Sequence, residues 1–470
     1  MTTTGPSDTK RVDNAALRGL PSVDRVLAHQ ALAAVREALP PSLVTEAARQ
    51  AVDAARRALL DGSSEQVTLD EIAERAAENA WLAVAPGLRP VINATGVIIH
   101  TNLGRAPLSD AALNAMRQAA GYSNLEYDLT QGERGSRYVH AVGILRRVVG
   151  CEDALVVNNN AAALVLALTC LCAGREAILS RGQSVEIGGG FRIPEIMKSS
   201  GARLVEVGTT NRTYARDYAD AITSESALIM RVHASNFRIV GFTTQPPVQE
   251  LADLAHRQGL VMLDDIGSGA LLDTTRYGLQ AEPTPQASLG AGADLVLFSG
   301  DKLLGGPQCG IIVGRAHLIG RLKKHPLTRA LRVDKLTLAA LEATLLHYLK
   351  GEAAREVPVW RMLAASQEEL RTTAEEWAAS LRQDGIICQV VPGESTIGGG
   401  SLPGETLPTY LLSIPLTEAT AGDQFASLRK QPTPIIARVE KGALLLDPRT
   451  VLPHQEQTLL DGLRRVLSRD

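Results

Sequence analysis

Short apolar runs alternate with helical stretches through the middle of this chain. The apolar runs lie at residues 154–157, 177–179, 203–207, 227–232, 260–263 and 295–298. Residues 161–171, 193–199 and 249–258 have the pattern of the intervening helices. Such alternation predicts parallel βαβ units, so we expect an α/β fold with a mostly parallel sheet and helices on both of its faces. Ligands in such sheets bind beyond the carboxyl ends of the strands.

Two regions of different character flank this α/β part. Residues 12–85 carry apolar side chains at helical spacing, which predicts a small helical domain over residues 1–85. After a helical passage, residues 386–391, 410–414, 434–440 and 443–447 have the pattern of strands, and residues 422–429 and 455–467 that of helices. We therefore expect a core over residues 86–345 and a small α+β domain over residues 346–470. On pattern alone, the helical domain is a packing or dimerisation arm.

Composition and charge exclude several classes of protein. The 470 residues are 45% hydrophobic, enough for large cores, and contain no apolar run of the length that a membrane span needs. The five cysteines form no CxxC pair, which favours a reduced, cytoplasmic protein without a disulfide or zinc framework. A net charge of −3 does not indicate a DNA-binding protein, and any RNA contact must come from local patches.

The strongest motif follows the last apolar run, where Ser299-Gly300-Asp301-Lys302 leads into a Gly-Gly-Pro turn. A buried strand that delivers one lysine to such a turn predicts that Lys302 forms a Schiff base with pyridoxal phosphate, while the Ser299 hydroxyl binds a phosphate oxygen. The SxxK spacing is weak by itself. It also occurs in serine acyl-transfer enzymes, but the SDN and KTG elements of those enzymes are missing from this sequence.

Two further strand ends raise the specificity of this interpretation. A carboxylate of Asp265, or alternatively of Asp264, can pair with the pyridine nitrogen, although either can also cap the following turn. Asn159, Asn160 and Ala161 lead from a strand into an Ala-rich helix, where backbone N–H groups bind phosphate or the asparagines only cap the helix. Phosphate loop, aspartate and lysine in this order predict a fold-type I pyridoxal-phosphate enzyme.

The sequence positions of two other polar residues leave their roles open. His233 follows a strand and either contacts the cofactor or is a satisfied structural histidine. Asp301 either helps to position a leaving hydroxyl or only stabilises the turn in front of Lys302.

At this point the chain resembles the bacterial selenocysteine synthases, the L-seryl-tRNA(Sec) selenium transferase family. The resemblance rests on Asn-Ala-Thr-Gly-Val-Ile-Ile-His-Thr-Asn-Leu-Gly-Arg-Ala-Pro-Leu at residues 93–108, Tyr-Asp-Leu-Thr-Gln-Gly-Glu-Arg-Gly-Ser-Arg at residues 127–137, and the lysine motif at residues 298–308. Further matching stretches lie at residues 17–24, 181–194, 328–335, 398–403 and 436–450. The similarity therefore spans nearly the whole chain.

The resemblance implies a substrate, a reaction and an assembly. Serine esterified to tRNA(Sec) would displace Lys302 from the cofactor, and the freed amine would take the Cα proton. Loss of the β-hydroxyl would leave an aminoacrylate, to which selenium from selenophosphate adds. The resemblance also implies that the helical domain at residues 1–85 binds the tRNA, and that the protein is a homo-oligomer of dimers in a larger ring, a decamer.

Arginines are the expected ligands of the selenium donor. The resemblance assigns Arg105, Arg329 and Arg332 to selenophosphate, and Arg329 and Arg332 would share one face if their stretch is helical. Spacing alone favours a solvated basic face, because Arg321 and Lys323 lie nearby.

A second function remains open. Relatives that share the Asn-Ala-Thr-Gly and Ser-Gly-Asp-Lys motifs are lyases or aldolases that act on a small amino acid or amino sugar. Such an enzyme has little use for the helical domain at residues 1–85, which favours the selenium transferase. An RNA-binding scaffold without catalysis is disfavoured by the intact Lys302 and Asp265.

Overall fold

The computed structural model describes residues 17–63, 66–187, 190–416 and 421–468. The chain forms two compact units, Met1–Pro90 and Val91–Asp470. The first boundary lies five residues beyond the expected end of the helical domain, and the expected core and C-terminal domain share the second unit. Residues 12–16 of the expected first helical stretch lie outside the described residues. No helix that the structure describes is long and apolar enough to cross a membrane.

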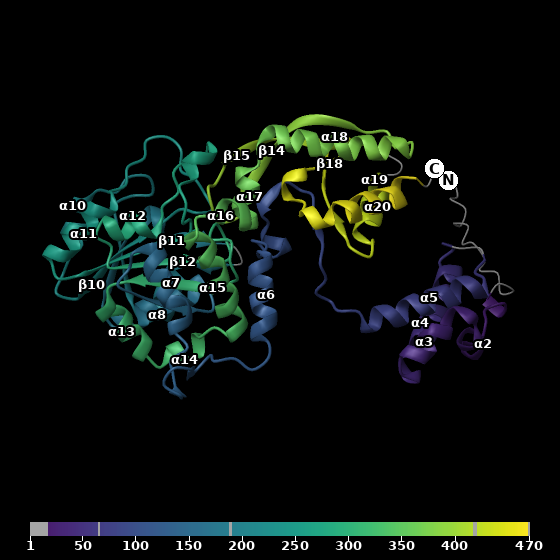
Figure 1. The fold of residues 1–470 in the computed structure, drawn as a ribbon, viewed down its shortest axis with the longest axis horizontal. Coiled ribbons are helices and arrows are strands. Elements are labelled where there is room, and N and C mark those ends of the chain that lie inside the picture. The colour runs from purple at the N-terminus through teal and green to yellow at the C-terminus, as the bar shows by residue number, and fades with distance from the viewer. Residues whose placement is uncertain (1–16, 64–65, 188–189, 417–420, 469–470) are drawn as a thin grey trace, which may run out of the picture. The chain divides into compact units, whose positions relative to one another are not determined.

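The first unit is helical, as the apolar spacing predicts (Figure 1). Its helices are α2 (Val23–Ala28), η1 (Gln30–Leu32), α3 (Ala33–Ala38), α4 (Pro41–Leu60) and α5 (Leu69–Val84). Thr68 and Glu71 form a capping box that fixes the start of α5. Alanines such as Ala48 and Ala76 are fully buried between the helices, and their small side chains let α4 and α5 pack closely.

A seven-stranded sheet forms the centre of the second unit, in the order β5-β13-β12-β11-β10-β6-β9. All six predicted runs are strands: β5 (Asp153–Val157), β6 (Glu176–Ser180), β9 (Arg203–Val207), β10 (Ser226–Val232), β11 (Val261–Gly267) and β12 (Leu295–Ser299). The seventh, β13 (Gly310–Gly314), runs antiparallel to both of its neighbours. The expected α/β fold with a mostly parallel sheet is confirmed.

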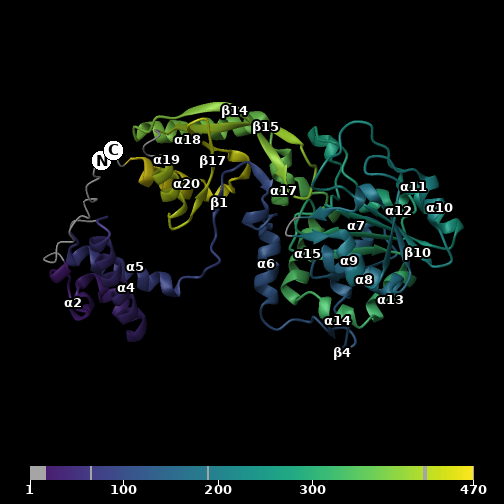
Figure 2. The same cartoon turned by 180° about the vertical axis from the view of Figure 1, so that it is seen from behind.

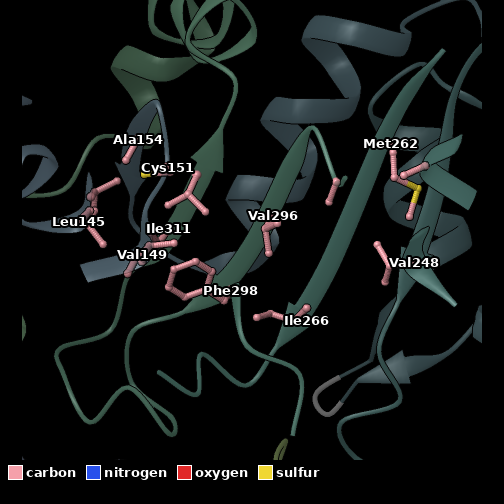
Figure 3. Packing of buried hydrophobic residues seen from close by; sticks show 14 of the residues in the cluster. Leu145, Val149, Cys151, Ala154, Val248, Met262, Ile266, Val296, Phe298 and Ile311 are labelled. Atoms are coloured by element: carbon pink, nitrogen blue, oxygen red, sulfur yellow. The ribbon is translucent and has the colours of Figure 1, made fainter. Parts of the chain in front are cut away.

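Helices cover both faces of this sheet, because successive side chains of a buried strand point to opposite sides. In β12, Val296 and Phe298 pack into one hydrophobic cluster, and Leu295 and Leu297 into the other. Figure 3 shows the first cluster, in which Val296 and Phe298 lie among other apolar side chains such as Met262. The first cluster includes α7 (Val139–Val149), α11 (Val248–Arg257) and α15 (Lys335–Leu349), and the second includes α8 (Asn160–Cys172), α9 (Ile193–Ser199) and α13 (Ala316–Lys324).

Shorter elements connect these layers. The helices are α6 (Asp110–Ala119), α10 (Ala215–Ala221), α12 (Pro285–Gly290), α14 (Leu327–Leu331) and α16 (Ala353–Glu356). Two small hairpins pair β3 (Tyr127–Asp128) with β4 (Glu133–Arg134), and β7 (Glu186–Ile187) with β8 (Phe191–Arg192).

The C-terminal part contains a five-stranded sheet in the order β17-β18-β15-β14-β2 and a two-stranded sheet of β1 and β16. Helix α18 lies along β14 and β15 (Figure 2). The strands are β1 (Ile92–Asn93), β2 (Val97–Ile99), β14 (Gln389–Gly398), β15 (Thr406–Pro415), β16 (Ile435–Ile436), β17 (Arg438–Glu440) and β18 (Ala443–Leu446). The helices are α17 (Pro358–Ala364), α18 (Gln367–Gln383), α19 (Ala421–Arg429) and α20 (Glu456–Leu467).

The position of the Asn-Ala-Thr-Gly segment in the structure differs from the expected domain division. Its strands β1 and β2 pair with β16 and β14, so residues 92–99 belong to the C-terminal sheets and not to the core over residues 86–345. Gly96 explains part of this arrangement, because a Cβ there would lie 2.2 Å from Oδ2 of the buried Asp447. The segment therefore joins the two parts of the second unit.

Candidate active site

The turn after β12 places Lys302 in a cavity of about 250 Å³ at the carboxyl ends of the strands. The cavity collects eight of the predicted site residues: Arg105, Asn159, Asn160, Ala161, Asp265, Ser299, Asp301 and Lys302. Gly267 and Gln308 complete its lining. Residues almost 200 positions apart in the sequence thus meet at one site.

The amine of Lys302 is held in a buried position, and the residue is only 8% exposed. Burial lowers the pKa of the Lys302 amine, and the nearby carboxylates of Asp265 and Asp301 oppose this effect. Gly400 lies against the amine, since a Cβ at this position would be 2.6 Å from Nζ. The setting favours the neutral, nucleophilic form of the amine more than a surface position does.

The two adjacent aspartates of β11 have different partners. Asp265 faces the Lys302 cavity and accepts hydrogen bonds from Nδ2 of Asn160 (2.8 Å) and the backbone N–H of Gly267 (3.1 Å). Burial raises the pKa of Asp265 to about 6. Asp264 accepts two hydrogen bonds, at 2.6 and 2.8 Å, from the guanidinium of Arg231 on β10. Of the two alternatives, only Asp265 lines the cavity of the lysine.

An ion pair ties the lysine turn to the loop that carries Arg105. Nη1 of Arg105 lies 2.6 Å from Oδ2 of Asp301, and the backbone N–H of Ala106 donates to the Asp301 carbonyl at 3.3 Å. Arg105 has a left-handed backbone (φ 66°), which is uncommon for a residue with a side chain. The ion pair leaves the Arg105 side chain 39% exposed, so part of its guanidinium remains accessible to an anion.

The start of α8 contributes the asparagines. Asn159 is the N-cap of α8 and accepts a hydrogen bond from the N–H of Ala162 at 2.8 Å. Asn160 and Ala161 form the first turn, whose free N–H groups and helix dipole suit a phosphate. Ser299 lines the same cavity from the end of β12.

Three predicted site residues lie outside the Lys302 cavity in this chain. His233 lines a neighbouring cavity of about 390 Å³, where its Nε2 lies 3.3 Å from Oε1 of Glu282. Arg329 and Arg332 line a third cavity of about 480 Å³ together with Glu126. The condition for the two arginines to share a helix face is not met, because α14 ends at Leu331 and Arg332 has an extended backbone that bridges to β5.

The geometry fits pyridoxal phosphate on four counts. The amine of Lys302 can bond the aldehyde, and the buried Asp265 carboxylate can hold a protonated ring nitrogen, which would offset the cost of its burial. Oδ1 of Asn160 is buried without a hydrogen-bond partner among the described residues, as expected where a ligand donor is to come. Gly267 and Gly400 leave room around Nζ that a side chain would fill.

Sequence reasoning did not identify Gln308, Gly400 or Glu282 as site residues. The run Gly398-Gly399-Gly400 was a signal, because glycine is required where backbone approaches another group. Glu282 gave no signal in the sequence, since it lies in a loop after η4 (Thr274–Tyr277).

The fold and the site define a pyridoxal-phosphate-dependent enzyme of fold type I, with a buried lysine at a strand end. Residues 91–452 match the family described as L-seryl-tRNA selenium transferase, and residues 17–56 match the family described as selenocysteine synthase N terminal. The chain belongs to the L-seryl-tRNA selenium transferase family.

Individual relatives agree with this assignment. The chain is 48% identical to the L-seryl-tRNA(Sec) selenium transferase of Moorella thermoacetica, over 96% of this chain and 97% of the relative. It is 47% identical to that of Geobacter sulfurreducens, over 96% and 99%. Among solved structures, D-glucosaminate-6-phosphate ammonia-lyase is similar with a TM-score of 0.56 and 21% identity, over 81% of this chain and 96% of that chain. This last likeness shows the fold alone.

Proposed function

We propose that this enzyme converts L-seryl-tRNA(Sec) to L-selenocysteinyl-tRNA(Sec), with selenophosphate as the selenium donor. The relatives named for this reaction match 96% of the chain, including its N-terminal helices. The observation that carries the proposal is the buried Lys302 amine beside the Asp265 carboxylate in one cavity. A lyase or aldolase would use the same cavity but would leave the helical unit without a role.

Pyridoxal phosphate, when bound, supplies an electron sink for the charge that develops at the substrate Cα. We assign its ring nitrogen to Asp265 and its phosphate to Ser299 and the N–H groups at Asn160 and Ala161, with Asn159 shaping the loop. The Nζ of Lys302 then takes the Cα proton, a role suited to an amine whose pKa is lowered by burial. His233 would support the cofactor from the neighbouring strand end.

We assign the selenium donor to the arginines. Arg105 has its guanidinium in the Lys302 cavity, and its partner Asp301 is the group best placed to position the leaving hydroxyl. Arg329 and Arg332 line a separate cavity of the same chain. We therefore propose that they reach the Lys302 cavity of a second copy, within a homo-oligomer of dimers in a larger ring, a decamer. Guanidinium groups suit a polyanionic donor because each can bind two oxygens.

The helical unit is assigned to the body of tRNA(Sec). It is a compact unit of its own, and α4 carries Arg49, Arg56 and Arg57. Exposed guanidinium groups bind phosphates without reading sequence. The unit can therefore bind the tRNA while the seryl end occupies the catalytic site.

Turnover of seryl-tRNA(Sec) with selenophosphate, compared with free serine, tests the proposal. The wild-type enzyme should form selenocysteinyl-tRNA(Sec) and leave free serine unchanged. Lys302→Ala should lose turnover and the visible absorbance of the lysine-bound cofactor, whereas Lys198→Ala, on α9, should keep both. Conversion of free serine at a comparable rate, or an unchanged spectrum of Lys302→Ala, would contradict the proposal.

A further inference from the structure

The cavity beside the Lys302 site has the lining of a nucleoside site. We name it the Glu282 cavity; it has a volume of about 390 Å³. The lining residues used below are His233, Phe237, Arg238, Gln245, Glu282 and Leu402. A buried carboxylate, an aromatic ring, a side-chain amide and a guanidinium are the groups with which proteins recognise an unpaired nucleotide.

Glu282 is a buried acidic residue of this cavity, and its side chain is 2% exposed. Its backbone is fixed, because its N–H donates to Oγ1 of Thr274 at 3.0 Å. Oε1 of Glu282 and Nε2 of His233 lie 3.3 Å apart, yet neither atom makes a hydrogen bond of normal geometry within the described ranges of the chain. A buried carboxylate oxygen accepts hydrogen bonds only, so it is suited to a ligand that brings a donor.

Three observations place the Glu282 cavity next to the Lys302 amine. The backbone N–H of His233 donates to the carbonyl of Asp265 at 2.8 Å. Gly400 lies against Nζ of Lys302, and Leu402, two residues further, lines the Glu282 cavity. The negative charge of Glu282 also raises the pKa of the Lys302 amine, against the larger effect of burial. The Glu282 cavity is therefore adjacent to the cavity in which the substrate Cα has to lie.

We propose that the Glu282 cavity binds the terminal nucleoside of the acylated RNA, with the Glu282 carboxylate accepting the ribose hydroxyl next to the seryl ester. The inference rests on the proposed function, since it requires a substrate in which serine is esterified to a ribose. Acidic side chains at the ends of sheet strands bind ribose hydroxyls in dinucleotide-binding folds by the same chemistry. The Phe237 ring and the Gln245 amide contact the base. Arg238 is 51% exposed at the rim, where its Nη1 lies 3.7 Å from Oε1 of Glu405, and its remaining N–H groups contact the adjoining phosphate.

The same carboxylate discriminates against free serine. In the ester the serine carboxyl is uncharged, whereas free serine would bring a second negative charge close to the buried Glu282 carboxylate. Like charges in a poorly solvated site repel strongly. Glu282 therefore binds the ribose of the seryl ester and disfavours binding of free serine.

A binding cycle on the cofactor-loaded full-length enzyme tests the inference. The probes are two forms of tRNA(Sec) that carry serine through a stable 3′-amide, one with and one without the 2′-hydroxyl on the terminal ribose. Loss of this hydroxyl should weaken binding to the wild type about tenfold, the effect of one hydrogen bond to a charged acceptor. Glu282→Ala should bind both probes equally, and Glu282→Gln should show an intermediate ratio.

The exposed Glu250 on α11 provides the matched control, and Glu250→Gln should keep the tenfold ratio. Each ratio is taken within one variant, so a general loss of stability does not change its meaning. Equal binding of both probes by the wild type, or an unchanged ratio in Glu282→Ala, overturns the inference. If the wild type still turns over seryl-tRNA(Sec), the proposed function survives that result; if turnover is absent, both fail.

Discussion

Gly400 offers a sharp test of how closely the Lys302 amine must be positioned. An added Cβ at Gly400 would lie 2.6 Å from Nζ and 2.8 Å from Cε of Lys302. Non-bonded heavy atoms rest about 3.5–4.0 Å apart, so in Gly400→Ala the amine has to move by about 1 Å. The obstructed atoms are the end of a flexible side chain, and the protein can fold around the change.

The structure gives two separate magnitudes for this substitution. Gly400 has φ 81°, and forcing alanine into the left-handed region costs roughly 1–2 kcal/mol of folding free energy. Displacing a catalytic group by about 1 Å costs about 100-fold in rate. We therefore expect a modest loss of stability in Gly400→Ala, together with a fall of about 100-fold in kcat/KM for seryl-tRNA(Sec).

Gly404→Ala separates the two effects. Gly404 has φ 77°, almost the same backbone conformation, and a Cβ there would meet no atom within 4 Å. Chemical denaturation should show a similar loss of stability in both variants. Turnover with selenophosphate should fall only in Gly400→Ala, with a changed visible absorbance of the cofactor. Equal kcat/KM in the two variants would refute the claim that the amine is held in place by the backbone at Gly400.

Three further predictions concern other parts of the chain. In the cofactor-free protein, the pKa of Asp265 is about 6 against an ordinary 3.8, so the folded state binds this proton more tightly. The free energy of unfolding should fall by up to about 3 kcal/mol as pH rises from about 3.8 to about 6. In Asp265→Asn, denaturation curves measured across this pH range should show a weaker dependence of the unfolding free energy on pH. Removal of residues 1–90 should weaken binding of tRNA(Sec) but leave cofactor absorbance unchanged, in titrations of both. Arg332→Ala should reduce selenium transfer more than it weakens seryl-tRNA(Sec) binding, when the two are measured separately.

The apolar pattern predicted six of the seven strands of the central sheet, but it did not predict β13 or its antiparallel direction. Buried strands such as β12 are apolar on both faces, and this signal is local to each strand. β13 follows the lysine turn after a short connection, and its direction depends on pairing with both β12 and β5. The pairing of β1 and β2 with β16 and β14 joins residues more than 290 positions apart, which no local pattern encodes.

The candidate site residues that directly follow strands could be predicted from the sequence. The choice between neighbouring candidates could not, because it depends on their tertiary contacts. Lys302 and Asp265 follow apolar runs, so the general rule for parallel sheets brings them together. The choice between Asp264 and Asp265 needed the register of β10 and β11, which places Arg231 directly beside Asp264. Arg231 binds the Asp264 carboxylate, which does not line the cavity, whereas the Asp265 carboxylate does.

The positions of Arg329 and Arg332 carry a consequence for assembly. A helix continuing through Arg332 would have presented both guanidinium groups on one face, but the N–H of Asn158 donates to the Leu331 carbonyl at 2.9 Å and Arg332 bridges to Val157. These contacts end α14 and tie the arginine segment to the start of the phosphate loop. The backbone next to Arg332 is therefore directly attached to the segment that leads into α8. We proposed that Arg332 reaches the Lys302 cavity of a second copy. In that case one backbone segment of this chain carries both a part of its own cofactor site and a residue that binds selenophosphate in the second copy.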